Sequence, residues 1–223
     1  EKAYAKLHGS YDAIRSGWAY AGMMDLTGAP CKIIRLDDTL MKTKILTGEL
    51  WNDLVRYDME NYVMSASTPG EDEVTETGKR QKNATGLVAG HAYTLIAAKN
   101  TSKGDRIVKL RNPWGQMEWT GDWSDTSSKW TEEMQNEIER LVNSDDGSFW
   151  MSFEDMCRFF YSINVCMVRY PKLSKKPWKE ERRKFYYDYE VLGDEEENAE
   201  NKEDDHVVFR ITCPVYALHV MEK

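Results

Sequence analysis

The pattern of apolar and polar positions predicts an alternation of helices and strands in the first third of the chain. Tyr4, Leu7 and Tyr11 recur at spacings of three and four, which indicates a helical start. A glycine-rich loop is expected to follow, through Gly17, Gly22 and Gly28. Beyond it, the pattern predicts a strand over 31–36, a helix over 49–59 and a short strand over 62–65.

Two β-type runs in the middle of the chain face each other across a short polar connection. The runs 93–99 and 106–111 flank a six-residue segment with one glycine, which predicts a β-hairpin. The preceding residues 66–86 are polar and are interrupted by glycine and proline, as is typical of a loop. Three elements are predicted after the hairpin: a helix over 132–142, a helix opened by a capping box at 152–155, and a strand over 163–170.

The composition of the chain changes at Pro171, which marks a predicted domain boundary. Residues 172–184 hold seven Lys and Arg against two Glu, whereas residues 194–205 hold eight Asp and Glu against one Lys. Three more strands are predicted, over 185–191, 207–212 and 215–221, and strands without a helix between them indicate a partial β-sandwich. Two alternatives stay open for the basic run: it contacts anionic lipid or the acidic run, or both runs are solvated.

Charge and composition exclude several classes of protein. The 223 residues carry a net charge of -8, so the average surface repels a phosphate backbone and we expect no nucleic-acid partner. No apolar run approaches the roughly 20 residues of a membrane-spanning helix, and the N-terminus lacks the apolar stretch of a signal peptide. Four cysteines are too few for a disulfide scaffold and form no CxxC pair, which predicts an intracellular, cytoplasmic protein.

His91 is the first candidate for chemistry, because it stands between small residues at the start of the hairpin. Opposing positions of the hairpin sum to roughly 204, which places His91 opposite residue 112 or 113. Asn112 could then accept the Nδ1–H of the imidazole and leave Nε2 to exchange a proton with a nucleophile. Five of the eight tryptophans cluster after this point, and the first, Trp114, could exclude water from the bond. The alternative is a structural histidine beside an Asn-Pro turn.

Four separated motifs resemble the calpain family of papain-like cysteine proteases. They are EKAYAKLHGSY at 1–11, GLVAGHAY at 86–93, LRNPWGQMEWTGDWSD at 110–125 and DGSFWMSF at 146–153. The resemblance implies an α+β fold in which residues 1–170 form the second, β-rich subdomain of the protease core, a barrel-like antiparallel sheet with flanking helices. It also implies that residues 171–223 are a linker and the start of a C2-like β-sandwich domain.

The same resemblance assigns catalytic roles. It makes His91 the general base, Asn112 its orienting partner and Trp114 the ring that covers them. The nucleophile of this family lies in an earlier subdomain, in a Gly-Asp-Cys-Trp motif with an upstream Gln that completes the oxyanion hole, and neither occurs in this sequence. The four cysteines fit small buried hydrophobes better than nucleophiles: Cys31, Cys157, Cys166 and Cys213. We therefore expect the chain alone to be inactive and to need the cysteine-bearing subdomain upstream in the same polypeptide.

Acidic residues near the tryptophans suggest a calcium site, although no EF-hand pattern is complete. The alternative is that they are solvated loop acids. The resemblance implies one calcium ion between two loops, with these ligands: Glu118, Asp125, the Ser144 carbonyl, Asp146 and Ser148. The family has Glu at the position of Ser148, so one strong ligand is replaced and we expect weak binding.

Three functions are compatible with these features. The first is a calcium-dependent cysteine endopeptidase that acts on intracellular proteins, with this chain supplying the His and Asn of a Cys-His-Asn triad. The second is a catalytically silent calpain-like structural or interaction module in a larger, for example cytoskeletal, assembly. The third is a calcium- or lipid-binding module whose basic run contacts a membrane surface weakly.

Overall fold

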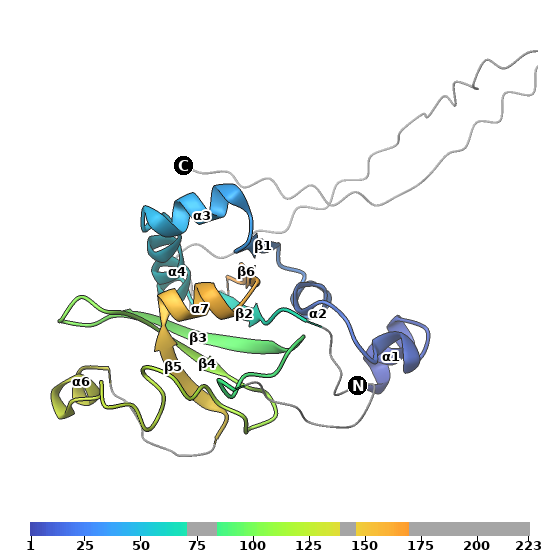
Figure 1. Ribbon diagram of the computed structural model, residues 1–223. Helices are drawn as coiled ribbons and strands as arrows, with labels where there is room; N and C mark the ends of the chain where they lie inside the picture. Colours follow the sequence, from blue (N-terminus) through green and yellow to red (C-terminus); the bar gives the residue numbers. More distant parts are fainter. Residues whose placement is uncertain (71–83, 139–145, 170–223) are drawn as a thin grey trace, which may run out of the picture. The chain divides into compact units, whose positions relative to one another are not determined.

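A six-stranded antiparallel sheet organises the computed structural model (Figure 1). The structure describes residues 1–70, 84–138 and 146–169. The strands are β1 (Cys31–Arg35), β2 (Val63–Ser67), β3 (Ala92–Asn100), β4 (Arg106–Arg111), β5 (Ser148–Ser152) and β6 (Ser162–Cys166). Their order across the sheet is β1-β6-β2-β3-β4-β5, so the last strand in sequence inserts between the first two.

The sheet is open, not closed into the barrel-like form that the resemblance suggested. Among the described residues, β1 and β5 lie at its two edges, and every neighbouring pair is antiparallel. The α+β class is confirmed. The chain divides into two units, Glu1–Pro177 and Trp178–Lys223. The tail over 171–223, with its predicted sandwich strands and charged runs, lies outside the described residues.

Helices cover one face of the sheet, where most of the buried apolar residues form one cluster, the larger core. The helices are α1 (Lys2–Leu7), α2 (Ala19–Thr27), α3 (Thr39–Leu46), α4 (Glu49–Met59), α6 (Glu132–Glu137) and α7 (Phe153–Phe159), with a 3-10 turn at Asp12–Ile14. Figure 1 shows α3, α4 and α7 on the same side of β3 and β4. Leu54 of α4 and Phe153 of α7 are completely buried in this core. Burying such a side chain contributes about 1.5–3 kcal/mol.

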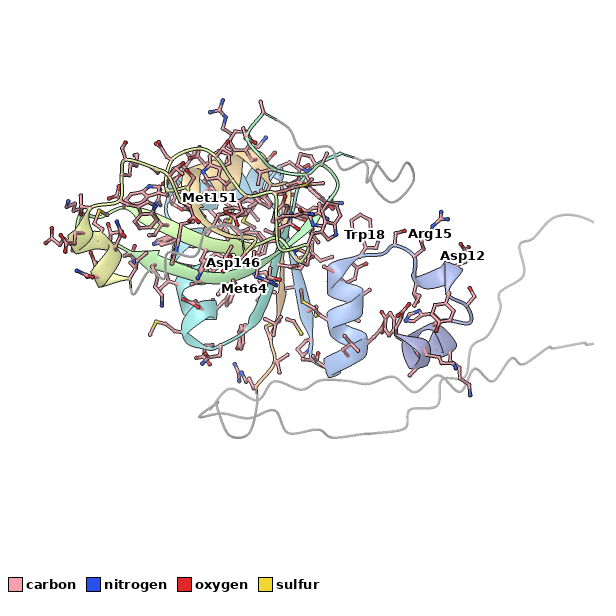
Figure 2. All side chains as sticks on the ribbon, turned by 90° about the horizontal axis from the view of Figure 1, so that it is seen from below. Asp12, Arg15, Trp18, Met64, Asp146 and Met151 are labelled. Atoms are coloured by element: carbon pink, nitrogen blue, oxygen red, sulfur yellow. The ribbon has the colours of Figure 1, made fainter. Side chains whose placement is uncertain are left out.

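Alternation along the strands explains why both faces of the sheet are buried. On β4, Val108 and Leu110 belong to the larger core, while Ile107 points to the opposite face. That opposite face carries two smaller clusters, one around Ile107 and one around Cys166 under α2. Figure 2 shows Met64 of β2 and Met151 of β5, both of the larger core, within the crowded interior.

The N-terminal segment differs from the sequence prediction. Where a glycine-rich loop was expected, residues 19–27 form the helix α2, with Gly22 inside it and Gly28 ending it at a φ of +66°. Packing of α2 against β1 and β6 outweighs the helix cost of one glycine. Asp12, Arg15 and Trp18 project from the segment before this helix (Figure 2), and Trp18 is 60% exposed.

Most other predicted elements are present. The strand at 31–36, the helix at 49–59, the short strand after Tyr62 and the helix after Ser152 are confirmed. Ser152 caps α7 as the capping box predicted, accepting the backbone N–H of Asp155 at 3.0 Å. Helix α6 forms the start of the predicted helix over 132–142 and ends at Glu137, and residues 139–142 lie outside the described residues. Helix α3 and strand β5 were not predicted, and none of the described helices is long and apolar enough to span a membrane.

The central hairpin forms with a shifted register. Thr94 pairs with Arg111 and Asn100 pairs with Arg106, one and two positions away from the predicted pairing. The shift changes along the hairpin because a bulge lies between Leu95 and Ala97. The prediction assumed a uniform ladder, so it placed the hairpin correctly and its register only approximately.

Candidate active site

At one end of the sheet, β2 and β4 finish and β3 and β5 begin, which brings together residues that are distant in the sequence. Thr68 follows β2, His91 precedes β3, Asn112 follows β4 and Gly147 precedes β5. The order β2-β3-β4-β5 places these positions in a row, because the end of one antiparallel strand adjoins the start of the next. Backbone hydrogen bonds join the row: Thr68 N–H donates to His91 O at 3.0 Å, and Asn112 N–H donates to Gly147 O at 2.8 Å.

The side chains of His91 and Asn112 form a buried hydrogen-bonded pair. Nε2 of His91 lies 2.9 Å from Oδ1 of Asn112. Asn112 is completely buried and His91 is 9% exposed. Oδ1 also accepts the backbone N–H of Trp114 at 3.1 Å, and the amide nitrogen of Asn112 donates to the Met117 carbonyl at 3.3 Å. These contacts fix the orientation of the amide, so Oδ1 accepts and Nε2 carries the proton.

The ring nitrogen in this bond is not the predicted one. The sequence prediction gave Nδ1 to Asn112 and left Nε2 for the nucleophile, whereas the structure places Nε2 against Asn112. Rotating the imidazole about χ2 interchanges the two edges of the ring, and strand register does not determine that rotation. Nδ1 is therefore the ring nitrogen that the bond to Asn112 does not use. Asn112 orients the ring without adding a charge.

Thr68 holds the backbone of His91 from the neighbouring strand. Its hydroxyl accepts the backbone N–H of His91 at 3.0 Å and donates to the Val88 carbonyl at 2.6 Å. Together with the backbone bond from Thr68 N–H, these contacts fix both peptide groups of the histidine. Because Thr68 is 3% exposed, water does not readily replace them.

Tyr93 supports the same segment from inside the core. Its ring meets the imidazole of His91 edge-on, with centroids 5.1 Å apart and planes at 82°. Its hydroxyl accepts the backbone N–H of Val88 at 2.9 Å. Burial raises the pKa of Tyr93 to about 12, outweighing the opposite effect of that hydrogen bond, so the phenol stays protonated.

The ring of Trp114 packs against the imidazole of His91. Its ring centroid lies 4.1 Å from that of His91, with an angle of 38° between the planes. Excluding water on this side strengthens the hydrogen bond between His91 and Asn112, because the local dielectric constant is lower. Trp114 follows Asn112 by two residues, so a single turn provides the orienting amide and the covering ring.

Gly147 permits the close approach of β5 to this turn. It adopts a φ of +82°, and a Cβ atom there would lie 2.6 Å from the carbonyl oxygen of Asn112 and 2.8 Å from Cα of Gly115. Only glycine fits such a position without displacing the backbone. A glycine at position 147 is thus required by the geometry of the site.

The other clustered tryptophans are structural. Trp119 joins the larger core and donates its indole N–H to the Asp122 carbonyl at 2.8 Å. Trp123, Trp130 and Trp150 pack together on the opposite face, with successive centroids 4.9 and 6.4 Å apart. The rings therefore hold the long β4–β5 connection on the sheet, which keeps Asn112 and Trp114 in place.

Three of the five predicted calcium ligands, Glu118, Asp146 and Ser148, lie at the turn that leads into β5. Glu118 accepts the backbone N–H of Gly147 at 2.8 Å through Oε1, and Asp146 accepts that of Ser148 at 2.7 Å through Oδ1. Asp125 is half-buried, and Ser144 lies outside the described residues. Within the described ranges, no three His, Cys, Asp or Glu side chains gather as a metal site requires. The described residues alone do not complete the predicted site.

Asp146 has a stabilised negative charge at this turn. Desolvation acts to raise its pKa, but the hydrogen bonds from Ser148 and the positive charges of Lys109 and Arg111 outweigh that effect. The net result is a pKa below the ordinary value for an aspartate. Glu118 contacts Gly147, whose carbonyl oxygen in turn accepts the backbone N–H of Asn112. Two successive hydrogen bonds through Gly147 thus link Glu118 to Asn112.

The described cysteines are not placed as nucleophiles. Burial raises the pKa of Cys31 and that of Cys157 to about 12, so both are thiols at neutral pH. Cys166 is completely buried and lies opposite Val63, at the other end of β2 from Thr68. Cys166 is thus buried as expected, whereas Cys31 and Cys157 are only partly buried. Cys213 lies outside the described residues.

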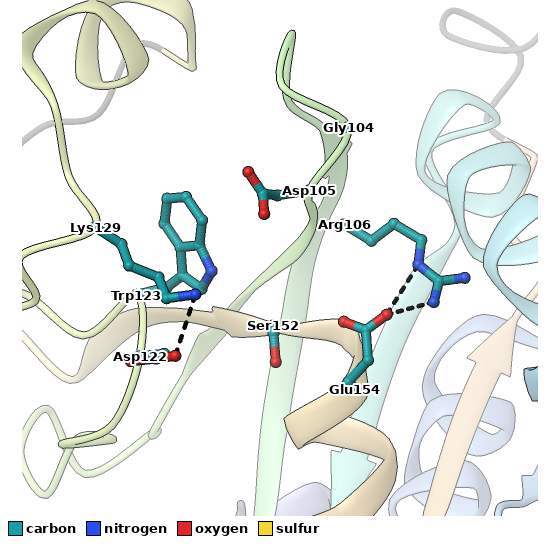
Figure 3. Close-up of a pocket in the computed structure, with 8 residues that line it drawn as sticks. All are labelled: Gly104, Asp105, Arg106, Asp122, Trp123, Lys129, Ser152 and Glu154. Atoms are coloured by element: carbon teal, nitrogen blue, oxygen red, sulfur yellow. Dashed lines mark hydrogen bonds and ion pairs between the residues drawn. The ribbon is translucent and has the colours of Figure 1, made fainter.

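A polar pocket lies apart from this row of strand ends (Figure 3). It has a volume of about 410 Å³ and lies between the hairpin tip, the tryptophan-rich connection and the junction of β5 with α7. Lys129 pairs with Asp122 at 3.2 Å, and Arg106 pairs with Glu154. Since these cations already have carboxylate partners, the pocket presents little uncompensated positive charge.

Sequence reasoning missed three residues that support His91 or Asn112. Thr68, Tyr93 and Gly147 contact His91, its segment or Asn112, and none was a candidate. A threonine directly after a predicted strand carries no distinctive signal. Gly147 did carry one, because a glycine between an acidic residue and an apolar run is typical of a turn that needs a positive φ.

Comparison with known sequences identifies relatives of this chain. The family model for the calpain family cysteine proteases matches residues 1–167. The calpain-type cysteine protease DEK1 of Arabidopsis thaliana is 38% identical over 173 residues, covering 77% of this chain and 8% of that protein. Calpain-5 of Mus musculus is 36% identical over 198 residues, with 82% and 30% covered. Calpain-14 of Homo sapiens is 36% identical over 180 residues, with 79% and 24% covered.

These matches cover most of this chain and a small part of each relative. The chain spans 8% of DEK1 and 30% of calpain-5. The matched region contains the whole described sheet and the row of strand ends that holds His91 and Asn112. The chain belongs to the calpain family of cysteine proteases.

Proposed function

We propose that this chain supplies the histidine and asparagine of the catalytic triad in a calpain-type cysteine endopeptidase that acts on intracellular proteins. The observation that carries the proposal is the buried bond between Nε2 of His91 and Oδ1 of Asn112, covered by Trp114. This bond orients the ring and leaves Nδ1 to exchange protons with a cysteine thiol. The family relationship supports the same reaction.

The proposed reaction cleaves an amide bond in two stages. Nδ1 of His91 takes the proton of a cysteine thiol, and the thiolate attacks the carbonyl carbon of the scissile bond. The imidazolium then gives its proton to the departing amine, which leaves an acyl-enzyme thioester. In the second stage, Nδ1 takes a proton from water, the hydroxide oxygen attacks the thioester, and the thiol leaves with its proton restored. Asn112 holds the ring throughout.

The cysteine of this reaction comes from another part of the same polypeptide. The sequence has no Gly-Asp-Cys-Trp motif, and burial holds Cys31 and Cys157 in the thiol form. The isolated chain is therefore proposed to be inactive. Sequencing the transcript upstream of Glu1 tests this division: a Gly-Asp-Cys-Trp motif in frame supports it, and another residue at the cysteine position contradicts it.

Activity measurements on the full-length protein test the role of His91. His91→Ala is expected to lower kcat/KM for a fluorogenic peptide by about 100- to 10,000-fold, as is usual when a general base is removed. His8→Ala is the matched control, because His8 lies at the surface, with Nε2 3.1 Å from Oδ2 of Asp25. Equal activity in the two variants would contradict the proposal, provided both unfold at the wild-type temperature.

We also propose that the turn before β5 binds calcium weakly. Support comes from the carboxylates of Glu118 and Asp146, which both contact this turn, and from the link through Gly147 to Asn112. When bound, calcium would neutralise these acids and order the turn. Calorimetric titration of the 223-residue chain should detect heat that Glu118→Gln reduces and Asp12→Asn, on an exposed turn, does not. A flat wild-type titration contradicts calcium binding and leaves the triad proposal untouched.

The alternative function is a silent calpain-like interaction module. The intact hydrogen bonding of His91 and Asn112 argues against it, because a purely structural fold does not require a buried, oriented imidazole. The same upstream sequence and full-length activity assay distinguish the two. A full-length protein that lacks the cysteine, or has it and shows no hydrolysis with or without calcium, would favour the module.

A further inference from the structure

Two cysteines from opposite ends of the described chain lie directly opposite each other in the sheet. Cys31 is the first residue of the edge strand β1, and Cys166 is the last residue of its neighbour β6. The antiparallel register pairs their Cα atoms. Residues paired in this way point their side chains to the same face of the sheet.

The backbone hydrogen bonds show which kind of pair this is. Met167 N–H donates to Pro30 O at 3.0 Å, and Leu36 N–H donates to Tyr161 O at 2.8 Å, so these flanking pairs are hydrogen-bonded. Because the two kinds alternate along an antiparallel ladder, Cys31 and Cys166 form a non-hydrogen-bonded pair. The Cα atoms of such a pair are about 4.5 Å apart, within the range of about 4.4–6.8 Å found for disulfides.

The surroundings of the pair allow one thiol to be reached from solvent. Cys31 is partly exposed and Cys166 is completely buried. Both belong to the small cluster under α2, with Met23 of that helix and Ala29. Thr27, also of α2, has its hydroxyl 3.4 Å from Sγ of Cys166. An oxidant can therefore contact Cys31 first, and the second thiol is already beside it.

We propose that Cys31 and Cys166 are a redox modification site that forms a reversible cross-strand disulfide with low-molecular-weight disulfides such as oxidised glutathione. The Cys31 thiolate attacks one sulfur of glutathione disulfide, and one glutathione thiolate leaves. Cys166 then loses its proton and attacks the Cys31 sulfur, which releases the second glutathione. Two thiols are oxidised, one disulfide is reduced, and the two protons end on the two glutathione molecules.

The disulfide would fasten the edge of the sheet without reaching the candidate active site. Cys166 pairs with Val63 at one end of β2, whereas Ser67 at the other end adjoins Thr68 and His91. Four residues of strand separate these ends, roughly 13 Å. Oxidation is therefore a change in the stability of β1 and α2, and the bond between His91 and Asn112 keeps its geometry.

The burial of the pair makes its oxidation slow at neutral pH. Desolvation raises the pKa of Cys31 to about 12, and the neighbouring Cys166 thiol adds to the shift. Only a small fraction of Cys31 is thiolate near pH 7, and that fraction grows about tenfold with each pH unit below the pKa. The rate of mixed-disulfide formation should rise about tenfold per unit between pH 7 and pH 9.

Oxidation of the 223-residue chain with glutathione disulfide at pH 9 tests the proposal. Peptide mapping without reduction should recover Cys31 and Cys166 in one linked peptide, and dithiothreitol should separate them. The midpoint of thermal unfolding should rise by about 5–10 °C on oxidation, since the cross-link closes a long loop. Cys31→Ser should remove both the linked peptide and the rise.

Cys157→Ser is the matched control. Cys157 has the same raised pKa but lies in helix α7, so its loss should change neither the cross-link nor the rise in the midpoint. The proposal would be overturned if Cys31 were recovered only as a mixed disulfide with glutathione. It would also be overturned if both cysteines were recovered as free thiols after the oxidation. A thermal shift that persists in Cys31→Ser would overturn it as well. This serine variant changes a partly exposed position, so the test does not depend on replacing buried Cys166.

Discussion

The sheet surrounds reactive groups at two separate places in opposite ways. At one end, His91 and Asn112 are surrounded by hydrogen-bond partners from three neighbouring strands and turns. At the other end, Cys31 and Cys166 lie in a small apolar cluster under α2. At the first end, polar partners orient the imidazole, whereas at the second, desolvation raises the pKa of Cys31 and keeps that thiol protonated. The degree of burial of a side chain alone therefore does not predict its reactivity. The polar groups that contact the side chain do.

The active-site end should also be the less tolerant of change. Its geometry depends on one close backbone approach and on hydrogen bonds that water cannot replace, because Asn112 is completely buried. The cysteine end depends on contacts between small side chains and should accept Cys→Ser with modest effects. Four substitutions sharpen this contrast.

The largest loss of stability is expected for Gly147→Ala. The new Cβ atom would lie 2.6 Å from the Asn112 carbonyl oxygen at a φ of +82°, so the free energy of unfolding should fall by about 2–4 kcal/mol. Urea denaturation measures it. Gly104→Ala is the control, because Gly104 has a φ of +88° and nothing within 4 Å of the new atom, so only the backbone strain of about 1 kcal/mol remains. Equal losses would show that the close approach is unimportant.

Asn112→Ala should lower the free energy of unfolding by about 2–3 kcal/mol. It leaves the Nε2–H of His91 and the backbone N–H of Trp114 without their shared acceptor. NMR should also show the Nε2–H resonance of His91 exchanging faster with water. Asn136→Ala, on the exposed side of α6, should change stability by less than about 0.5 kcal/mol. A protected Nε2–H in Asn112→Ala would refute the assigned bond.

Thr68→Val should cost about 1–2 kcal/mol and accelerate hydrogen exchange at the His91 amide. It removes the hydroxyl that accepts this N–H at 3.0 Å while keeping a similar shape. Thr68→Ser retains the hydroxyl and should leave exchange near the wild-type rate. If valine and serine behaved alike, the contact would be ordinary packing and not a positioning hydrogen bond. Cys31→Ser, at the opposite end, should leave His91 exchange unchanged.

The smallest effect is expected from the acidic turn. Because the folded-state pKa of Asp146 lies below its ordinary value of 3.8, the carboxylate stabilises the fold above that pH and the contribution is lost as pH falls through the folded pKa. Asp146→Asn should therefore flatten the loss of stability below about pH 4. Thermal unfolding from pH 6 to pH 2 measures it, with Asp12→Asn as an exposed control. If the stability of Asp146→Asn fell at low pH as steeply as that of the wild type, the lowered pKa of Asp146 would be contradicted.

Local patterns in the sequence predicted the hairpin and the pair of residues at its base. His91 and Asn112 are joined by adjacent strands and a short connection, so register arithmetic placed them together despite the bulge at Leu95. The contribution of Trp114 followed from its position two residues after Asn112. The orientation of the imidazole did not follow, because a χ2 rotation changes no pattern in the sequence.

Contacts between distant parts of the chain were beyond this kind of reasoning. Strand β6 inserts between β1 and β2, and only this crossover brings Cys166 beside Cys31 and Tyr161 beside Leu36. Helix α2 was missed because its glycine suggested a loop, while its packing against β1 and β6 decides its conformation. Propensity is a local quantity, and tertiary packing overrides it where an apolar face is available.

The edge position of β1 bears on self-association of the protein. An edge strand presents unpaired backbone groups that can recruit a strand from another molecule, and charged side chains on it oppose that pairing. Within the described part of the chain, β1 carries exposed Lys32 and Arg35 at such an edge. Two copies that approached edge to edge along β1 would bring these like charges close together, so the charges disfavour such pairing.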